Sequence, residues 1–273
     1  MTDATNRELA GLALDVARAA AALVRDRRRG DVTVAATKSS EVDIVTEADR
    51  ASEELIRDRL LTARPDDGVL GEEGDDVPSR SGVRWVVDPI DGTVNFLYGL
   101  PQYAVSIAAE RAGEAVAGVV IDVASGAEYV GHLADEHGPA AATRDGEPLQ
   151  VRTPAAMEQR LVATGFNYDA TIRQQQATAL ARLITRVRDV RRLGSCALDL
   201  CHVAEGSVDG YFEEGVNLWD HAAGGLIARL AGARFEAHPG VGGTPMIVCA
   251  PTHGFDDLLT SLRSAGFFTE PGE

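Results

Sequence analysis

The chain has 273 residues, and 26 Lys plus Arg against 42 Asp plus Glu give it a formal net charge of −16. With 45% hydrophobic and 25% charged residues, it is too apolar for a disordered acidic chain and too long to need disulfide staples. A net negative field repels phosphate backbones and anionic lipids. Binding to nucleic acid or to a membrane through bulk charge is therefore disfavoured.

The N-terminus and the cysteines indicate a cytoplasmic protein. No basic stretch leads into an uninterrupted apolar run, so neither a signal peptide nor a transmembrane span is predicted. Cys196, Cys201 and Cys249 are odd in number and lack C-x-x-C spacing, which argues against a disulfide framework or a thiolate zinc site. We expect all three to pack as small buried residues.

Two helices are predicted first in chain order. Thr5 and Glu8 form a plausible capping box for an amphipathic helix that stops at the run 27–30. Thr46 is the expected cap of a second helix, with Asp49 as its partner, and the sequence RPDDG closes that helix.

From residue 68 the pattern changes to strands. GVLGEE (68–73) and VRWVVD (83–88) read as strands, and an alternating stretch covers 105–130. Turn signals at 111–113 and 124–126 divide that stretch into an antiparallel meander.

The second half alternates strands and helices. No low-complexity linker and no repeat of fixed period is found, so one compact domain over 1–273 is expected, with two lobes meeting near residue 150. Strands are predicted over 161–166, 187–194, 209–214 and 246–251, and helices over 174–187, 197–204, 222–230 and 255–262.

The string WVVDPIDGTVNF (85–96) places two carboxylates three residues apart after a buried strand. Pro89 is expected to end that strand, and Gly92 to allow a tight backbone path. Hard oxygen ligands are those that Mg²⁺ takes, whereas D-x-x-D by itself also fits an Asx-turn. Four groups can converge here: the carboxylates of Asp88 and Asp91, the Thr93 hydroxyl and the Ile90 carbonyl.

Further carboxylates lie on either side of this string. Glu72 and Glu73 follow another predicted strand, and Asp220 begins a helix, where it also fits a role as a dipole-stabilising carboxylate. Asp75 and Asp76 are expected in a solvated loop. Two like charges about 4 Å apart cost about 4 kcal/mol at an effective dielectric of 20, so converging carboxylates imply bound cations that could clamp a phosphoryl group.

Four ordered strings resemble the motifs of the inositol monophosphatase family: 38–49, GEE at 71–73, 85–96, and LWDHAAG at 218–224. The stretch 194–215 is similar to the substrate pocket of that family. ATGFNYD and VRDVRRLGS resemble its bacterial, SuhB-type members. The resemblance implies a layered α/β fold, the αβαβα sandwich, together with lithium-sensitive catalysis and a homodimer.

The resemblance also implies roles for particular residues. Two to three Mg²⁺ ions would be held by Glu72, Asp88, Ile90, Asp91, Thr93 and Asp220, and Glu73 is the less favoured acid of its pair. Glu72 and Thr93, with Asp91, would act in catalysis by orienting and deprotonating a water for in-line attack. The substrate would contact Gly92, Thr93, Gly194, Ser195, Cys196, Glu213 and Asp220, and a mobile N-terminal segment would carry Lys38, Asp43 and Asp49.

The sequence therefore predicts a Mg²⁺-dependent phosphatase of a small phosphorylated polyol, with inositol 1-phosphate as the first candidate. Alternatives within the superfamily are histidinol-phosphate, fructose-1,6-bisphosphate and 3′-phosphoadenosine 5′-phosphate phosphatases. A different class is a metal-binding regulatory or interaction protein. His221, beside Asp220, is expected to pack structurally rather than to act as a base.

Overall fold

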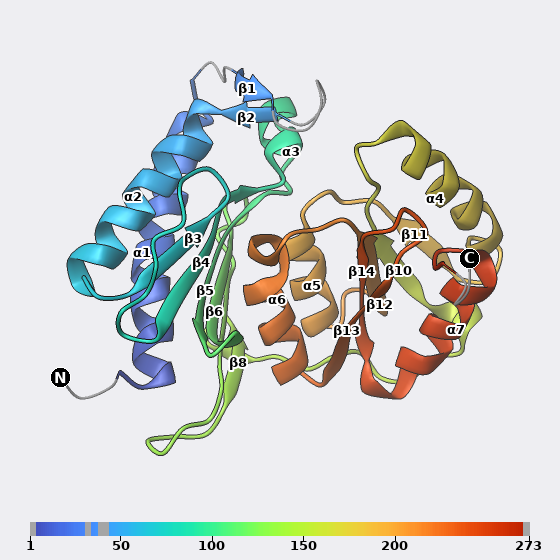
Figure 1. Cartoon of the computed structure of the whole chain (residues 1–273). Coiled ribbons are helices and arrows are strands. Elements are labelled where there is room, and N and C mark those ends of the chain that lie inside the picture. Colours follow the sequence, from blue (N-terminus) through green and yellow to red (C-terminus); the bar gives the residue numbers. More distant parts are fainter. Residues whose placement is uncertain (1–3, 31–33, 38–43, 270–273) are drawn as a thin grey trace.

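The computed structural model describes residues 4–30, 34–37 and 44–269. Within them, the two larger of three β-sheets alternate with three layers of helices (Figure 1). The order of layers is helix pair, seven-stranded sheet, helix pair, five-stranded sheet, helix pair. This arrangement confirms the predicted αβαβα sandwich. None of the described helices is long and apolar enough to span a membrane.

The helix pair outside the seven-stranded sheet is α1 (Asn6–Arg27) and α2 (Glu47–Ala63), and both predicted capping boxes are present. In the sheet beneath them, β3 runs parallel to β4 and all other neighbours are antiparallel, which confirms the predicted meander. The strands, in sheet order, are β3 (Gly68–Gly71), β4 (Val83–Asp91), β5 (Ala104–Arg111), β6 (Glu114–Asp122), β7 (Glu128–His132), β8 (Ala141–Arg144) and β9 (Glu147–Pro148).

The second lobe has a mixed sheet with two helices on each face. Helices α5 (Cys196–Ala204) and α6 (Leu218–Leu230) lie between the sheets, and α4 (Ala170–Leu183) and α7 (Phe255–Ala265) lie outside (Figure 1). The strand order is β11 (Asp189–Arg191), β10 (Leu161–Thr164), β12 (Gly210–Glu214), β14 (Pro245–Pro251) and β13 (Ala233–Pro239).

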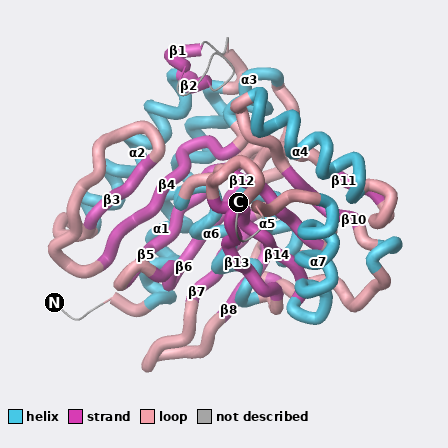
Figure 2. Tube along the Cα trace, turned by 45° about the vertical axis from the view of Figure 1, so that its right-hand side comes forward, coloured by secondary structure: helices cyan, strands magenta, loops and turns pink. Residues whose placement is uncertain are grey.

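Several elements differ from the sequence prediction. Helices α4 and α6 each begin four residues earlier than predicted, and for α4 the reason is the cap Asp169, whose carboxylate accepts the N–H groups of Thr171 and Ile172. Strand β13 was not predicted. Neither were the short elements β1 (Val34–Thr37), β2 (Ile44–Thr46), α3 (Thr93–Tyr98) and the 3₁₀ turns Met157–Gln159 and Thr252–Gly254; Figure 2 places β1 and β2 beside α3.

The chain passes from the first sheet to the second between Pro148 and Leu161. The single domain with lobes meeting near residue 150 stays a prediction. Helices α5 and α6 are buried along most of their length between the sheets, and all three cysteines are buried and free, as expected.

The packing of β6 against α6 depends on Gly118. A Cβ added there would lie 2.9 Å from the Cα of Ala223, closer than carbon atoms pack. Since the obstacle is backbone, neither layer can yield by a side-chain rotation. The distance between the first sheet and the central helices is therefore set by this glycine.

Replacing Gly118 by Ala is expected to lower the free energy of unfolding by about 1–3 kcal/mol, the usual cost of overpacking. The matched control is Gly11→Ala in α1, where a Cβ would meet nothing within 4 Å. That change should stabilise by about 0.5–1 kcal/mol because it removes a helical glycine. Urea unfolding of both variants measures the difference, and equal effects would contradict the packing argument.

Candidate functional site

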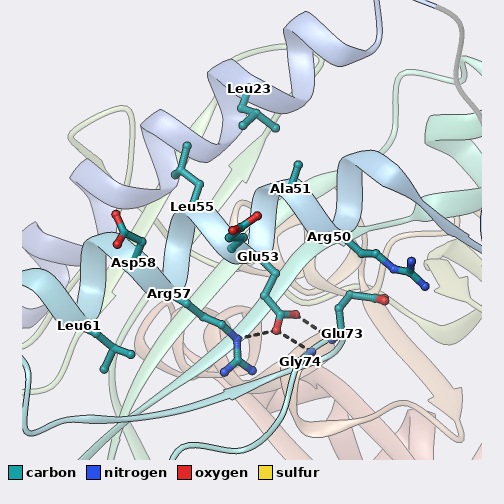
Figure 3. A pocket seen from close by; sticks show the side chains of 11 residues that line it. Leu23, Arg50, Ala51, Glu53, Leu55, Arg57, Asp58, Leu61, Glu73 and Gly74 are labelled. Carbon is teal, nitrogen blue, oxygen red and sulfur yellow. Dashed lines mark hydrogen bonds and ion pairs between the residues drawn. The ribbon is translucent and has the colours of Figure 1, made fainter.

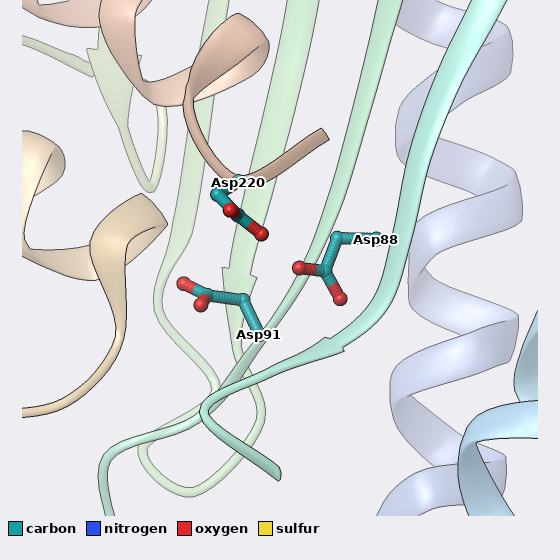
Figure 4. Close-up of side chains that lie close together, drawn as sticks. All are labelled: Asp88, Asp91 and Asp220. Atoms are coloured by element: carbon teal, nitrogen blue, oxygen red, sulfur yellow. The ribbon is translucent and has the colours of Figure 1, made fainter. Parts of the chain in front are cut away.

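An acidic cavity of about 460 Å³ lies where the end of β4 meets the start of α6. Asp88 and Asp91 come from β4 and Asp220 comes from α6, and their side chains lie close together (Figure 4). One carboxylate oxygen from each of the three lies within 4.8 Å of the other two. The first two carboxylates are buried and the third is partly buried.

A bulge in β4 explains how Asp88 and Asp91 converge. In a regular strand, side chains three apart point to opposite faces. Here Asp88 pairs with Ser106 and Asp91 pairs with Ala104. Between these two pairs β4 therefore contains one residue more than β5, which is a β-bulge. The expectation that Pro89 ends the strand was wrong: β4 continues to Asp91, and the residue without an N–H falls in the bulge.

Asp88 also forms the Asx-turn that the sequence left open. Its Oδ1 accepts the N–H of Ile90 at 3.0 Å. Asp88 can therefore form the Asx-turn and belong to the carboxylate cluster, because the turn bends the backbone so that Asp91 lies beside Asp88.

Asp91 is fixed from the second lobe. Its Oδ2 accepts the hydroxyl of Ser195 at 2.5 Å and the N–H of Ala197 at 2.7 Å. Burial raises the pKa of Asp91 to about 6, and these two hydrogen bonds oppose the rise. Ser195 does not line the cavity as expected; it caps α5 and turns its hydroxyl to Asp91 instead.

Asp220 fulfils the helix-start role that was the alternative for it. Its Oδ2 accepts the N–H of Asn217 at 2.6 Å. Burial, followed by the charges of Asp91 and Glu72, raises its pKa well above the usual range. The pKa of Asp88 is raised by burial and by the neighbouring acids Glu72, Asp91 and Asp220. Buried carboxylates that repel one another in this way are suited to a divalent cation.

The two acids of the GEE string separate. Glu72 lines the acidic cavity, although it lies outside the group of three that fits within 4.8 Å. Glu73 instead lines a second cavity, of about 730 Å³, beside α1 and α2 (Figure 3). Asp75 and Asp76 are exposed, as the sequence predicted.

Thr93 lies at the start of α3 and lines the cavity. Its hydroxyl is 3.0 Å from the Ile90 carbonyl and 3.1 Å from Oδ1 of Asp49, and its one hydrogen can be donated to only one of them at a time. Asp49 is fully buried in the first turn of α2, and its membership of a mobile segment stays a prediction. Lys38 and Asp43 lie outside the described residues.

Residues of the second half of the chain, together with Gly92, complete the cavity lining. Gly92, Gly194, Cys196 and Glu213 line the cavity, as expected. Tyr211 donates its hydroxyl to Oε2 of Glu213 at 2.6 Å, and burial raises the pKa of Glu213 to about 7. The sequence analysis did not single out several other lining residues, although most of them stand within the strings that carry the family resemblance, because a string does not show which of its side chains face a cavity; they include Phe166, Asn167, Tyr168, Arg192, Glu214, Val216 and Trp219.

His221 is absent from the cavity lining. Its ring packs against Phe235 with centroids 5.5 Å apart, and burial lowers its pKa to about 4. It is therefore neutral at pH 7, which agrees with the packing role expected for it.

Glu213 gives a pH prediction. Because its pKa is about 7 in the fold and about 4.3 when unfolded, the native state binds the proton more tightly, and its stability falls as pH rises from about 4.5 to 7. In chelator, Glu213→Gln should be more stable than the parent protein by about 1–2 kcal/mol at pH 8, and by less at pH 5. Denaturant titrations at both pH values measure this, with the exposed Glu158→Gln as control. A difference independent of pH would contradict it.

The alternating layers and the carboxylate-lined cavity fit a phosphatase of the layered α/β class. The chain belongs to the inositol monophosphatase family, whose sequence model matches residues 5–264.

Among curated proteins, "Inositol-1-monophosphatase SuhB" of Mycobacterium tuberculosis (strain ATCC 25618 / H37Rv) is 45% identical over 278 residues, covering 93% of each chain. "Nus factor SuhB" of Pasteurella multocida is 40% identical over 207 residues, covering 75% of each. The solved structure of Mycobacterium tuberculosis SuhB has a TM-score of 0.82 at 40% identity, covering 98% of this chain and 100% of its own. The structure of suhB from Bartonella henselae has a TM-score of 0.85 at 29% identity, covering 94% and 98%.

Proposed function

We propose that this phosphatase is Mg²⁺-dependent and hydrolyses a small phosphorylated polyol, with inositol 1-phosphate as the first candidate. The observation that carries the proposal is the convergence of Asp88, Asp91 and Asp220 within 4.8 Å, in a cavity that also holds Glu213. The relatives named inositol-1-monophosphatase support the choice of substrate.

The donor set fits magnesium, because carboxylate, carbonyl and hydroxyl oxygens are hard ligands. The residues that would hold two to three ions are Glu72, Asp88, Asp91, Thr93, Asp220 and the Ile90 carbonyl. When bound, Mg²⁺ would supply positive charge for the phosphoryl oxygens and lower the pKa of a water.

Thr93 and Glu72 are the proposed groups that orient the attacking water. When the Thr93 hydroxyl donates its hydrogen to Asp49, its oxygen can accept a hydrogen bond from that water. Glu72, an acid lining the same cavity, can accept the other proton. Asp91 is held by Ser195 and Ala197, so its carboxylate need not reorganise during the reaction.

Substrate binding is proposed for further groups that line the same cavity. Gly92 and Thr93 line the cavity at the start of α3, and their N–H groups are the proposed phosphate donors. Glu213 can accept hydrogen bonds from polyol hydroxyls while Tyr211 fixes its carboxylate. Arg192 is the one cationic side chain among the cavity-lining residues that the structure describes, and it can donate to hydroxyl or phosphate oxygens.

Asp91→Asn and Asp220→Asn should each reduce phosphate release by at least about 100-fold, because each removes one of the negative charges that gather the cations. The matched control is Asp75→Asn, which removes an exposed acid outside the cavity and should leave turnover unchanged. A phosphate-release assay at saturating Mg²⁺, with circular dichroism to verify the fold, makes the comparison. Near-normal turnover of either cavity variant would sink the metal assignment.

A substrate panel tests the finer proposal. Inositol 1-phosphate should give the highest kcat/KM against histidinol phosphate, fructose 1,6-bisphosphate and 3′-phosphoadenosine 5′-phosphate. Chelation should abolish the activity, Mg²⁺ should restore it, and Li⁺ should inhibit it. If another ester gave the highest kcat/KM, the proposed substrate would be wrong but the phosphatase activity would stand. Phosphate release that resists chelation would contradict the Mg²⁺ proposal.

A second, regulatory role remains a proposal with one supporting observation, the relatives named Nus factor SuhB. The homodimer, the lack of nucleic-acid binding and the cytoplasmic location also stay predictions.

A further inference from the structure

We propose that Glu53 of α2 is a positioning residue that holds Glu72 at the edge of the acidic cavity. The inference rests on the proposed function, in which Glu72 is a metal ligand. Glu53 does not line the acidic cavity; it acts through the loop that follows Glu72.

The carboxylate of Glu53 binds the backbone of that loop directly. The side chain is only 2% exposed. Its Oε2 accepts the N–H of Glu73 at 2.7 Å and its Oε1 accepts the N–H of Gly74 at 2.8 Å (Figure 3). The two peptide groups that come directly after Glu72 are thus tied to a single carboxylate.

Arg57, one turn further along α2, completes this anchor. Its Nε donates to Oε1 of Glu53 at 2.7 Å, and its Nη1 donates to the carbonyl of Asp75 at 2.7 Å. Arg57 and Glu53 form an ion pair, so the oxygens that accept the two backbone N–H groups belong to a carboxylate with its counter-ion beside it. Residues 73, 74 and 75 are therefore all attached to α2.

The glycines of GEEG fit around this carboxylate. A Cβ at Gly71 would lie 2.3 Å from Oε1 of Glu53, and a Cβ at Gly74 would lie 2.8 Å from the same atom. Neither glycine has a positive φ, so the requirement is for space rather than for an unusual backbone conformation. A larger residue at either glycine would collide with the carboxylate of Glu53.

Electrostatic repulsion explains why Glu72 needs such an anchor. Strand β3 ends at Gly71, so the strand ladder does not fix Glu72 itself. Glu72 lines the same cavity as Asp88 and Asp220, so negative charges on these acids repel one another. In the absence of a cation this repulsion pushes the loop outward, and the hydrogen bonds to Glu53 oppose that displacement.

The test is Glu53→Gln in the full chain, with Glu54→Gln as matched control because Glu54 is the exposed neighbour on the same helix. An amide can accept only one of the two N–H groups and points its own NH₂ at the other. In Glu53→Gln, the dissociation constant for Mg²⁺ measured by titration calorimetry should rise by about 10–100-fold. The Mg²⁺ concentration that restores half of the activity should rise by the same factor. Both quantities should be unchanged in Glu54→Gln. For Glu53→Gln, kcat at saturating Mg²⁺ should stay within a few-fold of the parent value.

A double-mutant cycle separates positioning from a general loss of stability. In a Glu72→Gln background, Glu53→Gln should cause no further weakening of Mg²⁺ binding, because the ligand it positions is already gone. An additive loss would overturn the inference, as would equal Mg²⁺ binding by Glu53→Gln and Glu54→Gln.

If Glu53→Gln does not fold, Arg57→Gln replaces it, since this variant keeps the carboxylate and removes its counter-ion. Arg57→Gln should also weaken Mg²⁺ binding, by a smaller factor than is expected for Glu53→Gln. Unchanged Mg²⁺ binding in Arg57→Gln would overturn the inference. A parent protein that neither binds nor needs Mg²⁺ would instead contradict the proposed function, so the two failures are distinguishable.

Discussion

Repulsion among buried carboxylates is the constraint on which this structure depends. Asp88, Asp91 and Asp220 bring like charges within 4.8 Å, and burial raises the pKa of each. Repulsion between like charges works against such a cluster. Hydrogen bonds from neighbouring elements therefore help to hold the carboxylates in place.

Helix α2 provides much of this support from one face. Asp49, Ser52 and Glu53 are buried at positions i, i+3 and i+4, which lie together on a helix. Asp49 accepts from the Thr93 hydroxyl, Ser52 donates to the Pro89 carbonyl at 3.2 Å, and Glu53 holds the loop after Glu72. One helix thus touches three separate segments of the site. Ser195 and Ala197 at the start of α5 donate hydrogen bonds to Asp91, so elements on both sides of the cavity help to position the carboxylates.

Much of the fold could be predicted from local patterns. The capping boxes at Thr5 and Thr46 and the turns of the meander are short-range signals, and the structure contains them where the sequence indicated. Pro89 was misjudged because a proline ends a strand only if its missing N–H is needed, and in a bulge it is not. Ser195 was misjudged because a hydroxyl beside a pocket motif gives no indication of which way it points.

The sequence by itself determined which residue types are available: a D-P-I-D-G-T string, further acids at Glu72 and Asp220, and an order of motifs that resembles one family. Only the tertiary structure decided which acids meet, because Asp220 is more than 120 residues from Asp91 and their convergence depends on how α6 packs between the sheets. It likewise decided that Glu53, which no motif singled out, lies under the loop of Glu72. The excess of 16 negative charges is a bulk property of the sequence, whereas its concentration at one junction is a property of the fold.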